Sequence, residues 1–174
     1  EFFVGNWLKK HPIFYLLSHM LVMPIIDFYT TGLDWMDNEN IPRGLVIFLI
    51  ITFLNGVVIE VGRKIRANSA EEFGVVTYSS LWGEKNATII WIIILFITFI
   101  CSNFACLFAG FSKLMVIYLT CFYLLCIYPA VAFLITKKQK DAQKIETAAG
   151  IWTIGMYLSL GGIPMIIHLL GGLS

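Results

Sequence analysis

Long apolar runs alternate with short polar segments along this chain. Five runs are close to the roughly 20 residues that a helix needs to cross the hydrocarbon core of a bilayer. Many of their residues are β-branched, but a backbone in lipid must satisfy its own hydrogen bonds, so long apolar runs form helices there. The pattern predicts an all-α, polytopic transmembrane bundle, one membrane domain over residues 1–174, with helices at residues 12–33, 44–62, 88–109, 114–135 and 147–170.

Prolines and small residues inside these runs predict their shape and contacts. Pro24, Pro129 and Pro164 lie within predicted spans and should bend them. Gly155 and Ser159 are four residues apart, a spacing that lets helices in a membrane approach closely.

The basic residues predict the orientation of the bundle, because cytoplasmic loops of membrane proteins are rich in Lys and Arg. With five spans, Arg43 and Lys113 fall on one side. The remaining bases fall on the other side, which is therefore predicted to be cytoplasmic, with the C-terminus outside: Lys9, Lys10, Arg63, Lys64, Arg66, Lys85, Lys137, Lys138, Lys140 and Lys144.

Composition supports an integral, multi-pass membrane protein. Hydrophobic residues make up 59% of the chain and charged residues 13%, about half the share that a soluble domain carries. The net charge of +1 leaves no basic surface large enough to follow a phosphate backbone, so nucleic acid is not an expected partner.

Charges of both signs gather in one predicted cytoplasmic loop, residues 60–87. Glu60 precedes Arg63 and Lys64 by three and four residues, so all three can share one face of a helix. The simplest interpretation is a helix end with internal ion pairs and basic residues close to anionic lipid. A functional interpretation is a diphosphate site, because carboxylates hold Mg²⁺ while Arg and Lys bind phosphate.

One stretch carries a resemblance to a known family. The segment NGVVIEVGRKIRANSAEEFGVVTYSSLWG resembles the second acidic loop of the UbiA-type intramembrane prenyltransferases. The segment from Gly74 through Thr77 and Tyr78, followed by Gly83, corresponds to the glycine and hydroxyl positions that open the next helix in that family. The opening EFFVGNWLKKHPIFYLLSHMLVMP is similar to the segment before the central helices of some bacterial members.

The resemblance implies a nine-helix fold of which this chain forms the last five helices. The chain would then be a fragment that lacks the N-terminal half and its first acidic motif, and it would be inactive in isolation. It also implies an enzyme of a bacterial inner membrane, surrounded by lipid. That enzyme transfers an isoprenoid chain from a prenyl diphosphate to an acceptor and depends on Mg²⁺.

Site residues follow from the resemblance, position by position. Glu60, Glu71 and Glu72 would be metal ligands, and Asn55 would lie beneath the metal. Diphosphate contacts would come from three bases: Arg63, Lys64 and Arg66. The family usually has two Asp residues four positions apart, whereas this chain has Glu60 and then Lys64 at that spacing.

Two other functions remain open at this stage. Asp27 and Asn55 lie in apolar runs, and polar residues at membrane depth can line an ion path, so a transporter or permease subunit is one alternative. A non-catalytic lipid-binding subunit is the other. His19 is expected to pack with a hydrogen bond, and Tyr118, Phe122 and Tyr123 either line a prenyl tunnel or pack between helices.

Overall fold

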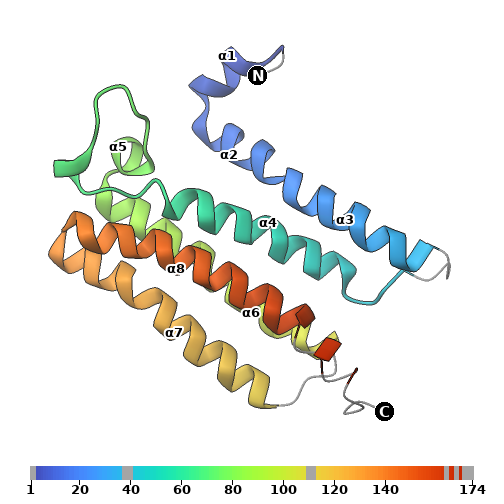
Figure 1. Cartoon of the computed structure of the whole chain (residues 1–174). Helices are drawn as coiled ribbons and strands as arrows, with labels where there is room; N and C mark the ends of the chain where they lie inside the picture. Colours follow the sequence, from blue (N-terminus) through green and yellow to red (C-terminus); the bar gives the residue numbers. More distant parts are fainter. Residues whose placement is uncertain (1–2, 37–40, 109–112, 163–164, 167–168, 170–174) are drawn as a thin grey trace.

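The computed structural model describes residues 3–36, 41–108, 113–162, 165–166 and 169 (Figure 1). All regular structure in these residues is helical, which confirms the predicted all-α class. The helices are α1 (Gly5–Lys10), α2 (Pro12–Met20), α3 (Val22–Trp35), α4 (Leu45–Gly62), α5 (Tyr78–Trp82), α6 (Glu84–Phe108), α7 (Lys113–Thr136) and α8 (Gln139–Tyr157). A 3₁₀ turn covers Asn68–Ala70, and a π-helical turn, Leu158–Gly162, continues α8.

Four helical segments of the described chain are long and apolar enough to cross a membrane: Pro12–Trp35, Leu45–Gly62, Glu84–Phe108 and Met115–Thr136. The predicted fifth span, residues 147–170, is not among them. Its first half belongs to α8, which begins earlier, at Gln139, with two polar turns. Its second half includes residues outside the described ranges.

Proline separates the first predicted span into two helices. Pro24 has no N–H to donate to the carbonyl of Met20, so the helical ladder is interrupted where α2 and α3 meet. Pro129 lies inside α7, which continues through it. The predicted bend at Pro164 lies outside the described residues.

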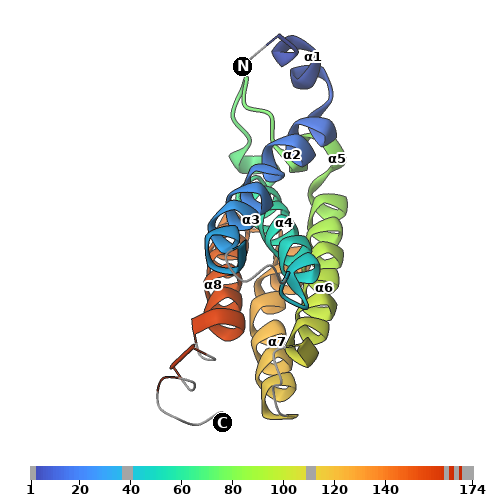
Figure 2. The same ribbon diagram turned by 90° about the vertical axis from the view of Figure 1, so that its right-hand side faces the viewer.

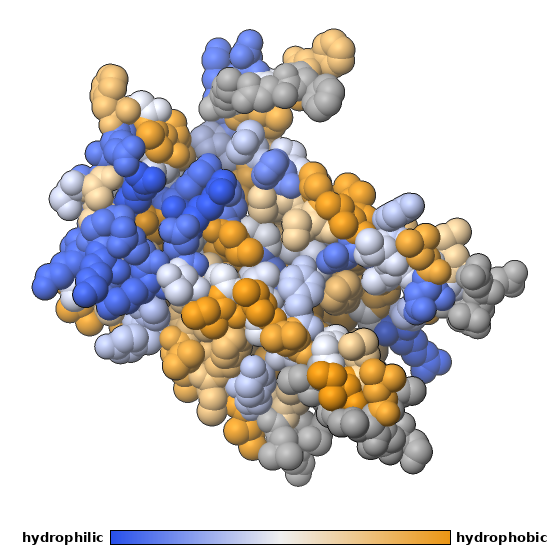
Figure 3. Space-filling view, viewed as in Figure 1, coloured by the Kyte–Doolittle hydropathy of each residue, from blue (hydrophilic) through white to orange (hydrophobic). Residues whose placement is uncertain are grey.

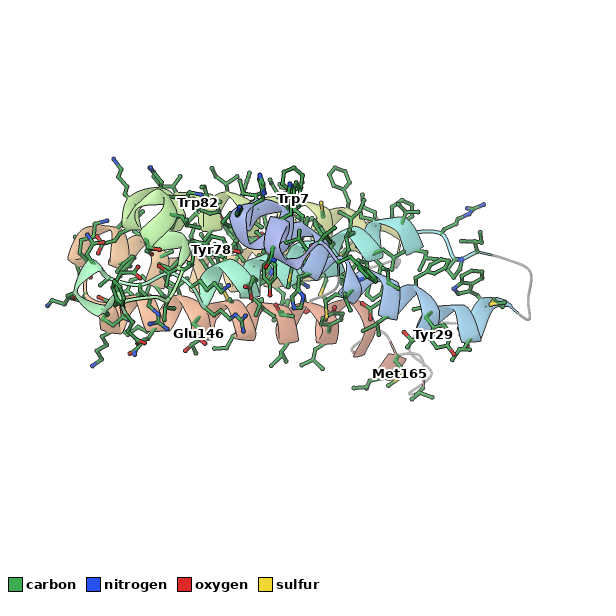
Figure 4. The ribbon with its side chains drawn as sticks, turned by 90° about the horizontal axis from the view of Figure 1, so that it is seen from above. Trp7, Tyr29, Tyr78, Trp82, Glu146 and Met165 are labelled. Carbon is green, nitrogen blue, oxygen red and sulfur yellow. The ribbon has the colours of Figure 1, made fainter. Side chains whose placement is uncertain are left out.

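The long helices lie side by side with alternating direction, and α2 and α3 lie against α4 (Figures 1 and 2). This arrangement gathers hydrophilic residues at one end of the bundle (Figure 3). We call this the charged end; it holds residues 63–77, α5 and the first turns of α6 and α8. In Figure 4, Tyr78, Trp82 and Glu146 mark the charged end, and Tyr29 and Met165 mark the opposite end.

Close approaches hold the last turns of α4 in place. The indole Nε1 of Trp91 in α6 donates a buried hydrogen bond of 2.9 Å to the carbonyl of Val58. A Cβ added at Gly62 would lie 2.9 Å from that same indole nitrogen and 3.1 Å from the Cβ of Ala149 in α8. Only a residue without a side chain therefore lets α4, α6 and α8 meet at this level.

We predict that Gly62→Ala lowers the stability of the protein by about 1–3 kcal/mol, because a methyl group at a packed site forces its neighbours apart. Thermal unfolding in detergent measures the effect. Gly150→Ala in α8 is the matched control, because nothing lies within 4 Å of its added Cβ. Equal melting temperatures for the two variants would contradict the close approach at Gly62.

Asp141 stabilises the first turn of α8 through side-chain hydrogen bonds. One carboxylate oxygen accepts a hydrogen bond of 2.7 Å from Thr136, at the end of α7, and the other accepts one of 2.8 Å from Lys144. The hydrogen bonds from Lys144 and Thr136 hold the pKa of Asp141 below its ordinary value. The ionised carboxylate therefore stabilises the turn between the two helices.

We predict that Asp141→Asn lowers the melting temperature at pH 7. A carboxyl group whose pKa is lowered by folding stabilises the protein above its unfolded pKa of about 3.9, and that contribution is lost as the pH falls through the folded pKa. The difference between wild type and Asp141→Asn should therefore shrink between pH 5 and pH 3. The exposed Glu146→Gln serves as control, and a difference that does not change with pH would contradict the prediction.

Candidate functional site

Glu60 lies in the last turn of α4 and is almost fully buried, with 3% of its surface exposed. Arg63 Nη2 lies 2.7 Å from its Oε2, and Lys64 Nζ lies 2.8 Å from its Oε1. Both expected ion pairs are thus present. The contact between Lys64 and Oε1 does not have hydrogen-bond geometry, so this buried oxygen accepts no hydrogen bond from the described residues.

Two tyrosine rings surround the ammonium group of Lys64. Its Nζ lies 5.9 Å from the ring centre of Tyr15 in α2 and 5.6 Å from that of Tyr78 in α5. Burial, assisted by the negative charge of Glu60, raises the pKa of Tyr78 to about 12. Tyr78 therefore stays neutral at physiological pH, and its ring faces Lys64 as a π-system and not as a counter-charge.

Three consecutive backbone N–H groups anchor the loop that follows α4. Those of Arg66, Ala67 and Asn68 donate to Ser79 Oγ, Gln139 Oε1 and Glu84 Oε1, at 2.9, 2.8 and 2.5 Å. The acceptors belong to α5, α8 and α6 respectively. Arg63 and Lys64 are therefore held between two fixed elements, the end of α4 and the anchored loop.

The other predicted acids have different partners. Glu71 accepts hydrogen bonds of 2.6 and 2.8 Å from Thr77, which caps α5. Glu72 pairs with Arg66 at 3.0 Å. Among the described residues, no three His, Cys, Asp or Glu side chains come together as a possible metal site. The role of Glu60, Glu71 and Glu72 as metal ligands therefore stays a prediction of the family resemblance.

A cavity of about 220 Å³ lies beside Glu60, between α2, α3, α4 and α8. We call it the inter-helix cavity. His19, Met20 and Met23 line one side of it, and Thr153 and Tyr157 line the other. Along α4 its lining runs from Asn55 through Ile59 and Glu60 to Arg63.

A second cavity of about 320 Å³ lies on the loop side of Arg63. We call it the polar cavity. Arg63, Arg66 and Glu72 line it from the loop, and Gln139, Gln143 and Glu146 line it from α8. Arg63 lines both cavities, so its guanidinium marks the boundary between an apolar space among the helices and a polar space at the charged end.

Asn55 is the other predicted site residue that the structure brings to the inter-helix cavity. It is 1% exposed, and neither its amide oxygen nor its amide nitrogen has a hydrogen-bond partner among the described residues. A buried amide without partners is costly, so such a group in a native protein needs an explanation, such as an ordered water, a bound ion or a functional role.

Several residues that line the two cavities were not predicted from the sequence as site residues. Gln139, Gln143 and Glu146 follow an i, i+4, i+7 spacing, a signal of one polar helix face that the sequence does contain. His19 lies at the inter-helix cavity and stacks on Tyr15 at 5.8 Å. No feature of the sequence links His19 to Tyr157, because these residues are far apart in the chain.

The aromatic stripe of α7 packs between helices. Phe122 stacks on Trp152 of α8 with ring centres 5.6 Å apart, and Tyr123 stacks on Phe99 of α6 at 4.8 Å. Neither ring lies among the residues that line the two cavities. Of the two interpretations of this stripe, the structure favours packing.

Comparison with known proteins does not identify a family or a function for this chain. No family model matches the chain, and neither a curated protein nor a solved structure does. The function is therefore argued from the site itself.

Proposed function

We propose that the chain is part of a UbiA-type intramembrane prenyltransferase, with the diphosphate of its substrate bound at Arg63 and Lys64. The observation that carries the proposal is the position of Arg63, whose side chain lines both the inter-helix cavity and the polar cavity. A molecule with an anionic head and a hydrocarbon tail needs such a boundary. In this proposal the charged end faces the cytoplasm.

The head of the substrate would lie against Arg63 and Lys64. The cluster of Glu60, Arg63 and Lys64 carries one negative and two positive formal charges, so one positive charge remains for an anion. The side chains of Arg63 and Lys64 are 52% and 31% exposed, whereas that of Glu60 is 4% exposed. Glu60 is therefore a positioning residue that orients the two cations toward the ligand.

The tail of the substrate would extend between the helices. Met20, Met23 and Ile59 supply apolar surface in the inter-helix cavity, and methionine side chains adapt readily to chains of different shape. The exposed apolar faces of α2 and α3 beyond the cavity suit either lipid or further helices.

The proposed reaction transfers the isoprenoid group from oxygen to an acceptor. The bond between C1 of the prenyl chain and the diphosphate oxygen breaks, and its electron pair leaves with the diphosphate. The acceptor forms a bond to C1 and loses its proton to the released diphosphate or to water. Arg63 and Lys64 stabilise the negative charge that grows on the leaving group.

A Mg²⁺ ion stays a prediction of the family resemblance. Glu60, Glu71 and Glu72, which the resemblance implies as its ligands, have separate hydrogen-bond or ion-pair partners in the structure. We assign the direct side-chain contacts of the diphosphate to the cations Arg63 and Lys64.

We predict that Arg63→Gln weakens binding of geranylgeranyl diphosphate by about tenfold or more, because a hydrogen bond between charged groups contributes about 1.5–3 kcal/mol. Binding is measured on the full protein in lipid nanodiscs, together with transfer of the prenyl group in the presence of MgCl₂. Lys140→Gln removes the same charge from an exposed site at the charged end and should leave affinity within about twofold. Equal losses in both variants would show only general attraction of an anion, and unchanged binding in Arg63→Gln would remove the proposal.

Ion-coupled transport is a second candidate function, supported by one contact. The hydroxyl of Tyr157, which lines the inter-helix cavity, donates to Asp27 Oδ2 across a distance of 3.4 Å. A carboxylate at membrane depth beside a cavity could carry a proton or bind a cation.

The Asp27→Asn variant distinguishes between prenyl transfer and ion-coupled transport, because the two functions predict different results for it. Prenyl transfer predicts that this variant keeps most of its diphosphate binding, because Asp27 does not line the inter-helix cavity and belongs to α3, away from Arg63. Transport predicts loss of gradient-driven flux in proteoliposomes. Transport would be supported if the wild type shows flux but does not bind diphosphate, and if the flux disappears in Asp27→Asn.

A further inference from the structure

A groove with a volume of about 300 Å³ runs between α7 and α8, apart from the two cavities at Arg63. We call it the α7–α8 groove. Four residues of α7 and four of α8 line it: Leu125, Cys126, Tyr128, Pro129, Lys144, Thr147, Ala148 and Ile151. None of these eight residues lines the inter-helix cavity or the polar cavity. The groove is therefore a separate feature of the bundle.

The two ends of the α7–α8 groove differ in polarity. Lys144 lies in the second turn of α8, near the charged end. Ile151 follows seven residues later, about 10.5 Å farther along the helix. At that deeper level Ile151 is 46% exposed, and Leu125 of α7 is 65% exposed. The groove thus starts at a cation and continues over hydrocarbon.

The ammonium group of Lys144 is open to a ligand. Its side chain is 51% exposed, and its Nζ donates one hydrogen bond of 2.8 Å to Asp141. An ammonium group has three N–H bonds, so two more can point to an anion. Tyr128 of α7 lines the groove as well and is 70% exposed, so its hydroxyl can also donate to a ligand at the surface.

Basic residues outnumber acidic residues around this end of the groove. Residues 137–146 hold four lysines and two acids: Lys137, Lys138, Lys140, Lys144, Asp141 and Glu146. The turn between α7 and α8 lies at the charged end (Figure 1), where the surface is hydrophilic (Figure 3). An anion at Lys144 would be near the carboxylate of Asp141, but the lysines leave an excess of positive charge. Lysine clusters at the membrane end of a helix attract anionic lipid.

We propose that the α7–α8 groove binds an anionic phospholipid of the membrane. Its phosphate binds Lys144, and one acyl chain lies along the groove towards Leu125 and Ile151. A soluble phosphate would leave the apolar lining unused, and a lipid without net charge would leave the excess of positive charge unused. The site does not depend on the proposed prenyl transfer.

Three probes test the proposal: dioleoylphosphatidylglycerol, dioleoylphosphatidylcholine and glycerol 1-phosphate. The two lipids share their acyl chains and differ in net charge, and glycerol 1-phosphate has the phosphate without the chains. Native mass spectrometry of the full protein in a neutral detergent gives the dissociation constant of the first bound lipid. In the wild type, phosphatidylglycerol should bind more tightly than phosphatidylcholine, and an equal concentration of glycerol 1-phosphate should not displace it.

Lys144→Gln should weaken binding of phosphatidylglycerol by about tenfold, the typical effect of losing a hydrogen bond between charged groups. Lys85→Gln in the first turn of α6 is the matched control, because it removes the same charge from an exposed site at the charged end. It should leave the affinity within about twofold.

Thr147→Trp tests the other half of the site. Thr147 is exposed and lines the groove, so a tryptophan there fills the space of the acyl chain while every charge stays in place. This variant keeps the ion pair of Lys144 with Asp141, so loss of that pair cannot explain its result. Binding of both lipids should fall by about tenfold, and binding of geranylgeranyl diphosphate should not change.

Four results would overturn the proposal. Unchanged phosphatidylglycerol binding in Lys144→Gln and Thr147→Trp would show that the groove is not the site, as expected if another helix covers it. Equal losses in Lys144→Gln and Lys85→Gln would show only general attraction of an anion. A loss in Lys144→Gln without one in Thr147→Trp would remove the acyl chain from the groove. Displacement of the lipid by an equal concentration of glycerol 1-phosphate would indicate a site for a soluble anion.

Discussion

The buried carboxylate of Glu60 is the constraint around which the charged end of the bundle is organised. A carboxylate with 3% exposure at the end of an apolar helix requires compensating charge, and Arg63 and Lys64 supply it from the next turn. The chain that leaves α4 is then held by the backbone N–H groups of Arg66, Ala67 and Asn68, which bond to α5, α8 and α6. Ion pairs of this kind contribute little net stability compared with apolar residues of similar size. The proposed binding of an anion at Arg63 and Lys64 would give these ion pairs a function.

Two cavities lie on either side of Arg63, although α4 makes close contacts at neighbouring levels. Gly62 brings α4 against Trp91 and Ala149, and Gly56 brings it against Met20, so the helices are close at these two levels. The inter-helix cavity lies along the same part of α4, from Asn55 to Arg63, with α2 and α3 on one side and α8 on the other. A polar space at the charged end and an apolar space among the helices then meet at one guanidinium. In the proposed function, an amphiphile would place its anionic head at this boundary and its tail among the helices.

Much of the helix pattern could be predicted from the sequence, because hydrophobicity over some 20 residues reports directly on burial in lipid. The predicted span 44–62 is α4, Leu45–Gly62, almost residue for residue, and the predicted span 88–109 differs from α6, Glu84–Phe108, by a turn. Hydrophobicity could not show that α8 begins at Gln139, since its first two turns are polar and are held by Asp141. It also could not separate α2 from α3, although Pro24 lies in the first turn of α3, beside the break at Leu21.

By itself the sequence determined the helical class, the gathering of basic residues at one end and the pairing of Glu60 with Arg63 and Lys64. Each of these depends on residues that are near one another in the chain or on the alternation of direction between spans. Only the tertiary structure decided that Asn55 and Glu60 line one cavity, that His19 and Tyr157 line the same cavity, and that Gln139 anchors Ala67. It also gave Glu71 and Glu72 partners of their own, Thr77 for Glu71 and Arg66 for Glu72. Such contacts join distant segments through helix packing, and no local pattern specifies them.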